Sequence, residues 1–596
     1  MGNVSKIRRS IFFIIVISLM FITIPKYLHF PVWGLGSFLT SKLVVYPIYA
    51  GIIFELYLAY KNRKNISFDL TGETRFLLAY IGIYFLVILV SVIHGMAIYP
   101  FMAEVLKGPS PIEKLPAVLG FLNSHDIAVS SESLTKIWLV CRYLKGFLLS
   151  TLLSFGVVYL LFRWCRKDVK LYFRILVCGV VASVVIISLY CFIEIPYLAH
   201  YKWAEKILTF INPFLHEIKI NGGWWPPLLW KNQIRSLFPE PSHFGIYAAF
   251  AMPFLWYAFI RLKSMKYKAA MAVLIAFYTF SLFLTSARTA FVLFIGEVGL
   301  LFIYTLYLHS KCIAKHVGVI MLISAVAFGT SLGFISYQVH PQAVNRLAQA
   351  KAKSNAATKD KTNVVAQKAK SNAATKDKAN VVAQKAKSNA AAKDKANVAA
   401  KKSKVNASTK DKANAAAQYY IDSNLKSLTS TNQRSNASRF SVMRADFEVG
   451  LEHPLLGVGR NLRSPYVAKK LESYPKKSGE VKTWLKRMHS LGIMKAGIPT
   501  LGNYTVLFSE TGVLGLLVWI FPPAYLLWHL LKLLWLDKSR LDVAFFLISF
   551  TGLLVAAIGD TINIFYSYWL LLGLGYAFLY DWKMAGKIEQ GSESKS

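Results

Sequence analysis

The sequence predicts an all-α polytopic membrane protein, with about twelve transmembrane helices and a long extracytoplasmic loop between the ninth and tenth helices. Apolar residues make up 55% of the 596 residues, and the mean hydropathy is +0.42. Apolar runs recur along the chain, and each is long enough to cross roughly 30 Å of hydrocarbon as a helix. The short loops on one side of the predicted topology are basic, as the positive-inside rule requires. These observations exclude an ordinary soluble protein.

The candidate spans begin close to the N-terminus. The first follows the basic stretch "KIRRS" and resembles a signal peptide, but no small-residue cleavage site follows it. We therefore expect an uncleaved first helix. The predicted spans lie at about 11–25, 43–60, 76–98, 136–162, 175–196, 243–260, 269–286, 289–308, 317–337, 504–531, 543–558 and 562–580.

Loop charge sets the predicted orientation. With the N-terminus inside, the inner loops include "KNRKN" (61–65), "RWCRKDVK" (163–170) and "DKSR" (537–540), each short and basic. Both termini are then cytoplasmic. The predicted organisation is nine helices over 1–337 with outer loops at about 99–135 and 197–242, an outer loop over 338–503, three helices over 504–580 and a cytoplasmic tail over 581–596.

The long outer loop contains a tandem repeat. "SNAATKDK" begins at residues 354 and 371, "SNAAAKDK" at 388 and "VNASTKDK" at 405, so the period is 17 residues. From Lys351 to Lys412 there are 17 Lys and 4 Asp and almost no large apolar residues, so this array (about 351–418) cannot form a core. It is either a spacer or a cationic segment that attaches to anionic lipid or acidic glycan. Because it lacks aromatic residues and lies outside the cytoplasm, it does not indicate nucleic-acid binding.

The five cysteines lie in or beside apolar segments. They show neither a disulfide framework nor the spacing of metal ligands. The cysteines therefore give no indication of a metal site, and we expect no cofactor.

A charged, proline-rich stretch precedes the sixth predicted helix. "RSLFPEPSHFG" places Arg235, Glu240 and His243 at the outer mouth of that helix, and Pro241 stands where prolines begin helices. Glu240 suits the positive end of a helix dipole, and Arg235 suits an interfacial side chain that reaches for water. A functional role is the alternative interpretation of both residues.

A second motif favours the functional interpretation. In "LTSARTAF" (284–291) a turn of a few residues joins two apolar spans, so Arg288 is held at the outer membrane surface. The positive-inside rule gives no reason for an arginine there. Ionisable residues at such a depth usually face the bundle interior or a polar cavity and are functional.

The far end of the long loop carries a third motif. "ADFEVGLEHPLLGVGRNL" (445–462) predicts an amphipathic helix that ends in a Pro/Gly turn, and "LGNYTVLFSETGVLGLLVWIF" (501–521) re-enters the membrane. We expect the segment at about 437–503 to be a packed helical part of the loop.

Together, "TSARTAF", "HPLLGVG" and "SETGVLGLL", in this order around a large outer loop, resemble the O-antigen ligase and polymerase superfamily of bacterial envelope glycosyltransferases. "RSLFPEPSHFG" resembles an Arg…Glu-Pro-Ser-x-Phe-Gly element of its polysaccharide polymerases. The resemblance spans roughly 235–521. It implies a metal-independent, GT-C-like transferase at the outer face of the bacterial inner membrane, with a polyprenyl-diphosphate-linked glycan as donor. The acceptor would be a second lipid-linked repeat unit or lipid A-core.

The resemblance also implies roles for four residues. Arg235 and Arg288 would hold the diphosphate, because the planar guanidinium contacts phosphate oxygens in pairs. Glu240 and His489 are the candidates for the base that accepts the acceptor's proton. Ligases carry a His-Asn pair about nine residues before the acidic residue of the "ETG" element, whereas this chain has Leu501 and Gly502 there. The missing histidine favours a polymerase over a ligase.

The leading hypothesis is therefore a polymerase of O-antigen, capsular polysaccharide or exopolysaccharide. An O-antigen ligase, with His489 in the missing role, is the alternative within the family. A lipid-linked glycan transporter that uses charges buried in the bundle is the alternative of another class. The expected partners are the lipid-linked glycan, the acceptor, membrane lipids, and chain-length regulator and flippase proteins.

Overall fold

The computed structural model describes residues 2–30, 40–61, 72–107, 115–199, 201–215, 233–335, 434–475 and 477–593. These residues form helices and no strands. The chain divides into two compact units, Met1–Ala325 with Ser427–Ser596, and Val326–Lys426. All contacts described below lie within the first unit. The predicted repeat array (351–418) lies outside the described residues.

Nine helices of the described part are long and apolar enough to cross a membrane, which makes the protein a multi-pass membrane protein. Each overlaps one of the predicted spans, from the third to the eleventh. They are α3 (Gly72–Ala97), α6 (Ser131–Cys165), α7 (Val169–Leu198), α9 (Pro241–Arg261), α10 (Met265–Leu284), α11 (Arg288–Leu308), the helix Lys311–Ile335, α19 (Asn503–Leu536) and α20 (Leu541–Gly559).

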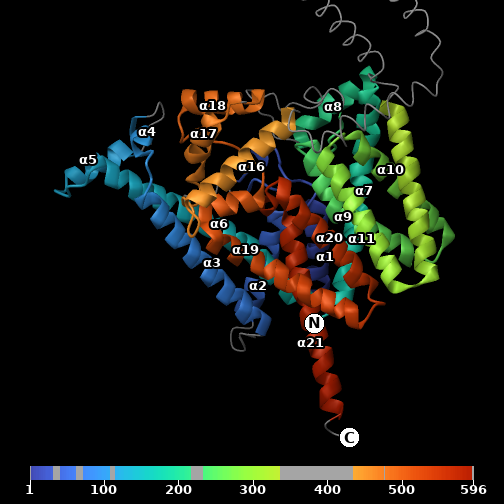
Figure 1. The fold of residues 1–596 in the computed structure, drawn as a ribbon. Coiled ribbons are helices and arrows are strands. Elements are labelled where there is room, and N and C mark those ends of the chain that lie inside the picture. The colour runs from blue at the N-terminus through green and yellow to red at the C-terminus, as the bar shows by residue number, and fades with distance from the viewer. Residues whose placement is uncertain are drawn as a thin grey trace, which may run out of the picture. The chain divides into compact units, whose positions relative to one another are not determined.

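Three further helices overlap the remaining predicted spans. They are α1 (Gly2–Ser18), α2 (Val45–Lys61) and α21 (Tyr566–Glu593). α1 packs against α2 and α7, and α21 packs against α6 and α19, so all three belong to the helix bundle (Figure 1). The total of twelve spans stays a prediction.

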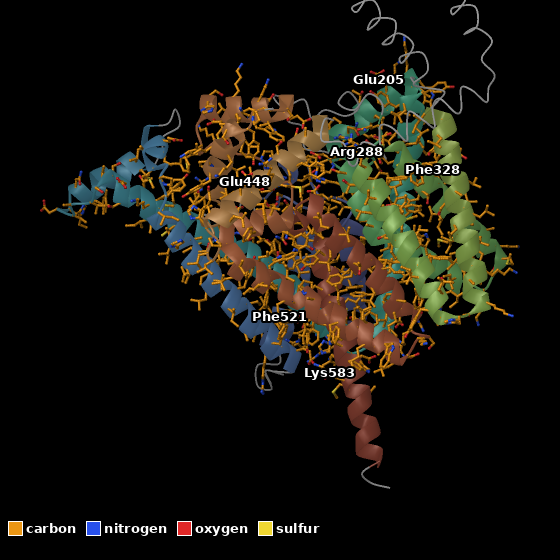
Figure 2. All side chains as sticks on the ribbon, viewed as in Figure 1. Glu205, Arg288, Phe328, Glu448, Phe521 and Lys583 are labelled. Carbon is orange, nitrogen blue, oxygen red and sulfur yellow. The ribbon has the colours of Figure 1, made fainter. Side chains whose placement is uncertain are left out.

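Shorter helices lie between the long ones. The connections carry α4 (Met102–Lys107), α5 (Leu115–Asn123), α8 (Lys202–Leu215), α16 (Arg434–Glu452), α17 (Arg463–Ser473), α18 (Gly479–Leu491) and the short 3₁₀ helices η1 (Lys26–Leu28) and η5 (Ile562–Ile564). We call the end of the bundle that carries α16–α18 the loop end. Figure 2 shows Arg288 and Glu448 near the loop end and Lys583 near the opposite end.

The helix α9 lies at the centre of the bundle. Its apolar window is 78% buried, the highest share among the nine candidate spans of the described residues. It packs against α7, α10, α11 and α20. Gly245 permits a close approach of α9 to α11, because a Cβ at this position would lie 2.6 Å from the Cα of Ala290. Small residues at such crossings let two backbones approach closely in a membrane.

The helices α16–α18 form a small domain-like layer with its own hydrophobic core. Val442, Val449, Val467 and Leu471 are fully buried in it. Ser478 caps the start of α18 by accepting a hydrogen bond from the Val481 backbone N–H at 3.2 Å. α16 packs against α19, so this layer is fixed to the membrane helices (Figure 1).

Candidate functional site

Arg235 is buried in a tight turn just before α9. Its side chain is 3% exposed, and Nη1 donates a hydrogen bond to the Pro239 carbonyl oxygen at 2.9 Å. Nη2 is buried and has no hydrogen-bond partner among the described residues. Burial lowers the pKa of the guanidinium, and the nearby Tyr190, Glu194 and Glu240 oppose that shift. A buried guanidinium with an unused donor is suited to bind an anionic ligand.

Glu194 of α7 holds this turn in place. Its Oε1 accepts the Arg235 backbone N–H at 3.0 Å, and its Oε2 accepts the Ser236 backbone N–H at 2.8 Å. Ser236 has a φ of 53°, a left-handed conformation that is uncommon for serine. Glu194 is buried, and its carboxylate is paired with the backbone of the Arg235 turn.

Glu240 is the N-cap residue of α9, and Pro241 follows it in the first turn, as expected. The Glu240 side chain makes no capping hydrogen bond to the helix backbone. Its Oε2 accepts a hydrogen bond from the Ser242 hydroxyl at 3.3 Å, and the residue is partly exposed. The carboxylate is therefore available for a partner other than the helix N-terminus.

Arg288 is the first residue of α11, directly after the short turn that follows α10. It is half-buried and close enough to Arg439 of α16 for the two guanidinium groups to interact electrostatically. Arg439 itself donates to the Gly559 carbonyl oxygen at the end of α20, at 2.6 Å. The sequence did not indicate Arg439, because its neighbour Arg288 is far away along the chain.

The turns of Arg235 and Arg288 are neighbours. The Ile234 backbone N–H donates to the Leu284 carbonyl oxygen at 3.4 Å, which joins the Arg235 turn to the end of α10. The first turns of α9 and α11 touch where Gly245 packs on Ala290. Two helix N-termini, each with a positive dipole end, therefore meet beside the two predicted arginines.

The motifs "HPLLGVG" and "SETG" form one interlocked unit. The backbone N–H of Val458 donates to the Ser509 carbonyl oxygen, and that of Gly459 to the Glu510 carbonyl oxygen, both at 2.9 Å. Gly512 interrupts α19 with a φ of 63°, where a Cβ would overlap the backbone at Leu455. The chain needs glycine there for both conformation and space.

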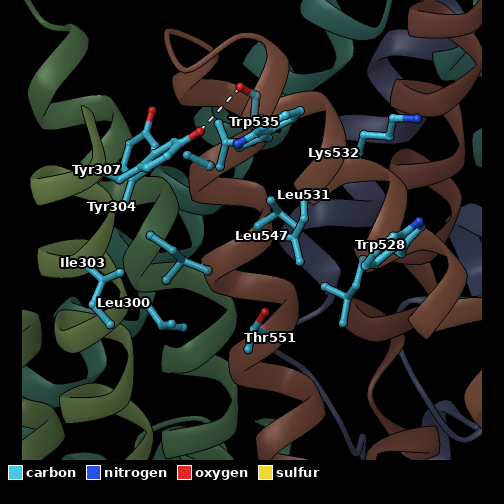
Figure 3. A pocket seen from close by; sticks show the side chains of 14 residues that line it. Leu300, Ile303, Tyr304, Tyr307, Trp528, Leu531, Lys532, Trp535, Leu547 and Thr551 are labelled. Carbon is cyan, nitrogen blue, oxygen red and sulfur yellow. Dashed lines mark hydrogen bonds between the residues drawn. The ribbon is translucent and has the colours of Figure 1, made fainter. Parts of the chain in front are cut away.

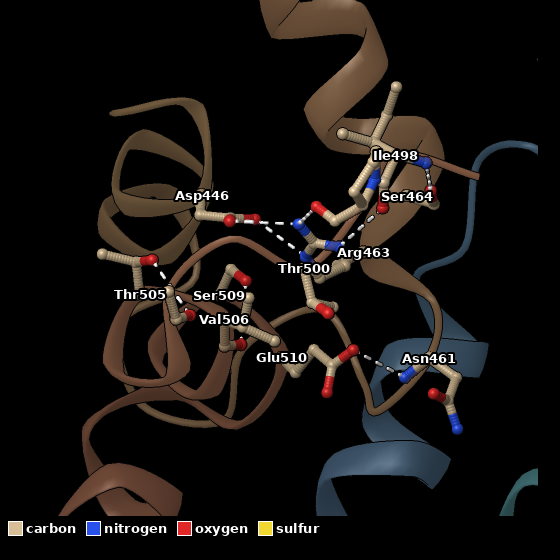
Figure 4. Close-up of polar contacts among 12 residues, drawn as sticks. Asp446, Asn461, Arg463, Ser464, Ile498, Thr500, Thr505, Val506, Ser509 and Glu510 are labelled. Atoms are coloured by element: carbon tan, nitrogen blue, oxygen red, sulfur yellow. Dashed lines mark hydrogen bonds and ion pairs between the residues drawn. The ribbon is translucent and has the colours of Figure 1, made fainter. Parts of the chain in front are cut away.

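This interlocked unit is anchored by a buried ion pair (Figure 4). Arg463 Nε lies 2.8 Å from Asp446 Oδ1, and its Nη2 lies 3.0 Å from Oδ2. The Ile498 and Pro499 carbonyl oxygens accept further hydrogen bonds from Arg463 at 3.1 Å. Burial raises the pKa of Asp446, and Arg463 opposes that shift. Every nitrogen of this guanidinium has a protein partner.

A second charged cluster surrounds Glu510 of the "ETG" element. Its Oε1 accepts the Asn461 backbone N–H at 3.1 Å, as Figure 4 shows. Arg460 interacts electrostatically with Glu510 and with Tyr84 of α3, and its guanidinium lies 5.0 Å from the Phe147 ring of α6. Sequence reasoning used Glu510 only as a reference position. The one local signal for Arg460 was its place directly after a Gly-x-Gly turn.

His489 lies in a different part of the molecule from the two arginine turns. Its side chain on α18 is 65% exposed, and Nε2 lies 2.6 Å from Glu472 Oε1 on α17. His453, which the sequence analysis did not single out, opens the "HPLLGVG" turn and stacks edge-on against Tyr466. Burial lowers its pKa, which favours the neutral ring at pH 7.

Metal binding has no evident place in the described part of the chain. No group of three or more His, Cys, Asp or Glu residues there could hold a metal ion. The five cysteines are free thiols.

No model of a known protein family matches this sequence, and no curated protein matches it either.

Proposed function

We propose that the protein is a glycan polymerase of the bacterial cytoplasmic membrane. It would join polyprenyl-diphosphate-linked repeat units into O-antigen, capsular polysaccharide or exopolysaccharide at the outer membrane face. In this proposal the chain has twelve spans in a GT-C-like arrangement, with both termini in the cytoplasm. The loop end then faces outward, and the loop over 338–503 is extracytoplasmic. The resemblance of the four short motifs to the O-antigen ligase and polymerase superfamily supports the proposal.

The observation that carries the proposal is the cluster of positive groups at the loop end, which consists of two helix N-termini and two arginines. The N-termini of α9 and α11 touch, Arg235 keeps an unused buried donor, and Arg288 stands on the first turn of α11. A sugar diphosphate leaves as an anion, so such fixed positive groups stabilise the transition state. Arginine suits this role because its planar fork contacts phosphate oxygens in pairs.

The proposed reaction transfers the growing glycan to a hydroxyl group. The hydroxyl oxygen of the acceptor bonds to the anomeric carbon while the bond from that carbon to the diphosphate oxygen breaks. Polyprenyl diphosphate leaves with the electron pair, and the hydroxyl proton passes to a base. We assign the base to Glu240, because it interacts with Arg235 and makes no helix-capping bond. His489 is the other candidate, with Glu472 to orient its ring.

Two other functions keep a supporting observation. In an O-antigen ligase acting on lipid A-core, His489 would fill the role of the missing histidine, and Glu472 would orient its ring. A lipid-linked glycan transporter would use charges buried in the bundle. Glu297 of α11 is 1% exposed, and neither of its oxygens has a hydrogen-bond partner among the described residues.

The test is synthesis with purified protein and one lipid-linked repeat unit, without added metal or nucleotide, followed by a glycan ladder gel. Wild type should produce a ladder, and Arg288→Ala and Arg235→Ala should lose it. Arg444→Ala is the matched control, because this arginine is 72% exposed on α16 and should keep the ladder. A ladder of unchanged length and amount from Arg288→Ala, at normal protein level, would contradict the mechanism.

The same assay separates the two alternative functions. Transfer only after lipid A-core is added would identify a ligase. No transfer in either assay would favour the transporter.

A further inference from the structure

A groove lies between α11, α19 and α20, away from the arginine turns. Its cavity volume is about 930 Å³, near the upper end of the ~300–1,000 Å³ typical of small-molecule sites. Figure 3 shows side chains from the three helices around it. The walls include Leu300 and Ile303 of α11, Leu531 of α19 and Leu547 of α20. The walls are almost wholly apolar.

The groove lies toward the end of the bundle opposite the loop end. Its residues come from the last turns of α11 and α19 and from the first half of α20. These helix ends adjoin two basic segments, 309–316 at the start of the helix Lys311–Ile335, and the loop 537–540. The positive-inside rule assigns such loops to the cytoplasmic side, so the groove lies at the depth of the cytoplasmic leaflet.

Two tyrosines at the rim direct their hydroxyl groups to the backbone. Tyr304 donates to the Lys538 carbonyl oxygen at 2.9 Å, and Tyr307 donates to the Trp535 carbonyl oxygen at 3.5 Å, as Figure 3 shows for the latter pair. Both hydroxyl groups are therefore satisfied, and the rings present carbon to the groove. Trp535 is 69% exposed, as expected of an indole at the membrane interface. This lining suits a hydrocarbon chain.

The same rim is cationic. Lys532 is a rim residue of the groove, and Lys538 holds its ammonium 4.4 Å from the Tyr307 ring. The two acids of the connection between α19 and α20 are already engaged: Asp537 accepts from Ser539, and Asp542 is paired with Arg540. No acidic side chain of the described residues pairs with Lys532. A ligand that places an anion at the rim and hydrocarbon between the helices is complementary to both features.

We propose that this groove is a binding site for one anionic phospholipid of the cytoplasmic leaflet. An acyl chain lies between α11 and α20, and the phosphate group contacts Lys532 and Lys538. Juxtamembrane lysines attract anionic lipids through the negative surface potential of that leaflet. Trp535 lies at the rim, at the depth expected for the head groups. The site does not depend on the proposed polymerase activity.

The experiment measures lipid binding to purified, delipidated protein in neutral detergent by native mass spectrometry. The probes are phosphatidylglycerol and phosphatidylcholine with the same acyl chains. We expect wild type to bind phosphatidylglycerol about tenfold more tightly than phosphatidylcholine. Lys532→Gln should lose that preference, whereas Lys263→Gln, an exposed lysine of another basic loop, should keep it. Equal affinity of wild type for both lipids would overturn the headgroup assignment.

A second pair of variants tests the groove itself. Leu531→Trp adds bulk to the wall of the groove at a residue that is 53% exposed, so the fold should tolerate it. Val273→Trp adds the same bulk on α10, away from the groove. Val273 is 68% exposed. Only Leu531→Trp should weaken binding of phosphatidylglycerol by about tenfold. Equal binding by both variants would place the lipid elsewhere. Displacement of phosphatidylglycerol by a polyprenyl phosphate at lower concentration would identify a prenyl chain as the occupant instead.

Discussion

Two buried arginines at the loop end differ in how their charge is satisfied. Arg235 and Arg463 are both 3% exposed. Arg463 makes two contacts with Asp446 and two with backbone carbonyl oxygens. Arg235 makes one side-chain hydrogen bond, to Pro239, and leaves Nη2 without a partner among the described residues. Buried polar groups are normally paired, so an unpaired one needs an explanation. These contacts give Arg463 a structural role, whereas our proposal assigns the unpaired donor of Arg235 to an anionic ligand.

The largest effects should separate these two arginines. Arg463→Met leaves Asp446 as an uncompensated buried charge, and breaking such a pair costs about 3–5 kcal/mol. We expect α16–α18 to lose protection in hydrogen exchange and the thermal midpoint to fall. Arg235→Met should keep the thermal midpoint and reduce polymer synthesis by about 100-fold or more. Loss of stability in Arg235→Met equal to that in Arg463→Met would remove the distinction.

The candidate bases belong to the same two regions. Glu240 lies beside Arg235, whereas His489 lies on the α16–α18 layer with Glu472. Removing a general base typically costs about 10²–10⁴-fold in rate. We expect this loss for Glu240→Gln in the ladder assay and almost none for His489→Gln. The opposite ranking would assign the base to α18 and favour the ligase alternative.

Glu194 should act through Arg235 as a positioning residue. In Glu194→Gln one carboxylate oxygen becomes an amide NH₂, which cannot accept the backbone N–H it now receives. An unmet backbone donor costs about 1–3 kcal/mol, so we expect roughly a tenfold loss of polymer synthesis. Groups that act as one unit are not additive. The double variant with Arg235→Met should therefore be no worse than Arg235→Met alone. Additive losses would show that Glu194 acts independently of the turn.

The membrane helices were predictable from the sequence, because hydropathy and helix-start signals are local. Some boundaries were not: α1 spans Gly2–Ser18 where 11–25 was predicted, and α21 runs to Glu593 where the predicted span ends at 580. Pro241 begins α9 and Arg288 begins α11, as the sequence indicated. The charge partners were not predictable. Glu194 and the Arg235 backbone that it contacts are 41 residues apart in the sequence. Arg439 and Arg288 interact although the long loop separates them in the sequence. Such pairings depend on which helices pack together, and apolar composition does not encode that choice. For the same reason the pairing of "HPLLGVG" with "SETG" was visible only in the structure.

The smallest expected effect is a pH dependence of protein stability that arises from His453 in the "HPLLGVG" turn. Burial lowers the pKa of His453, the nearby His94 adds to this, and Glu452 opposes it. The folded-state pKa then lies below the unfolded value of about 6.5. The stabilisation is complete above that value and is lost as the pH falls through the folded-state pKa. The effect is small because the ring is partly exposed to solvent.

The measurement compares thermal midpoints at pH 7.5 and 5.5 for wild type and His453→Gln. Wild type should lose slightly more stability on acidification than the variant. Only wild type has this ring, which binds a proton more readily in the unfolded state than in the folded state. If the region of Arg463 is structural, the variant should also keep its polymer synthesis at pH 7.5, because the "HPLLGVG" turn is stabilised by backbone hydrogen bonds. If the variant has the thermal midpoint of wild type but makes no polymer, His453 takes part in the reaction, and the catalytic region extends into the loop.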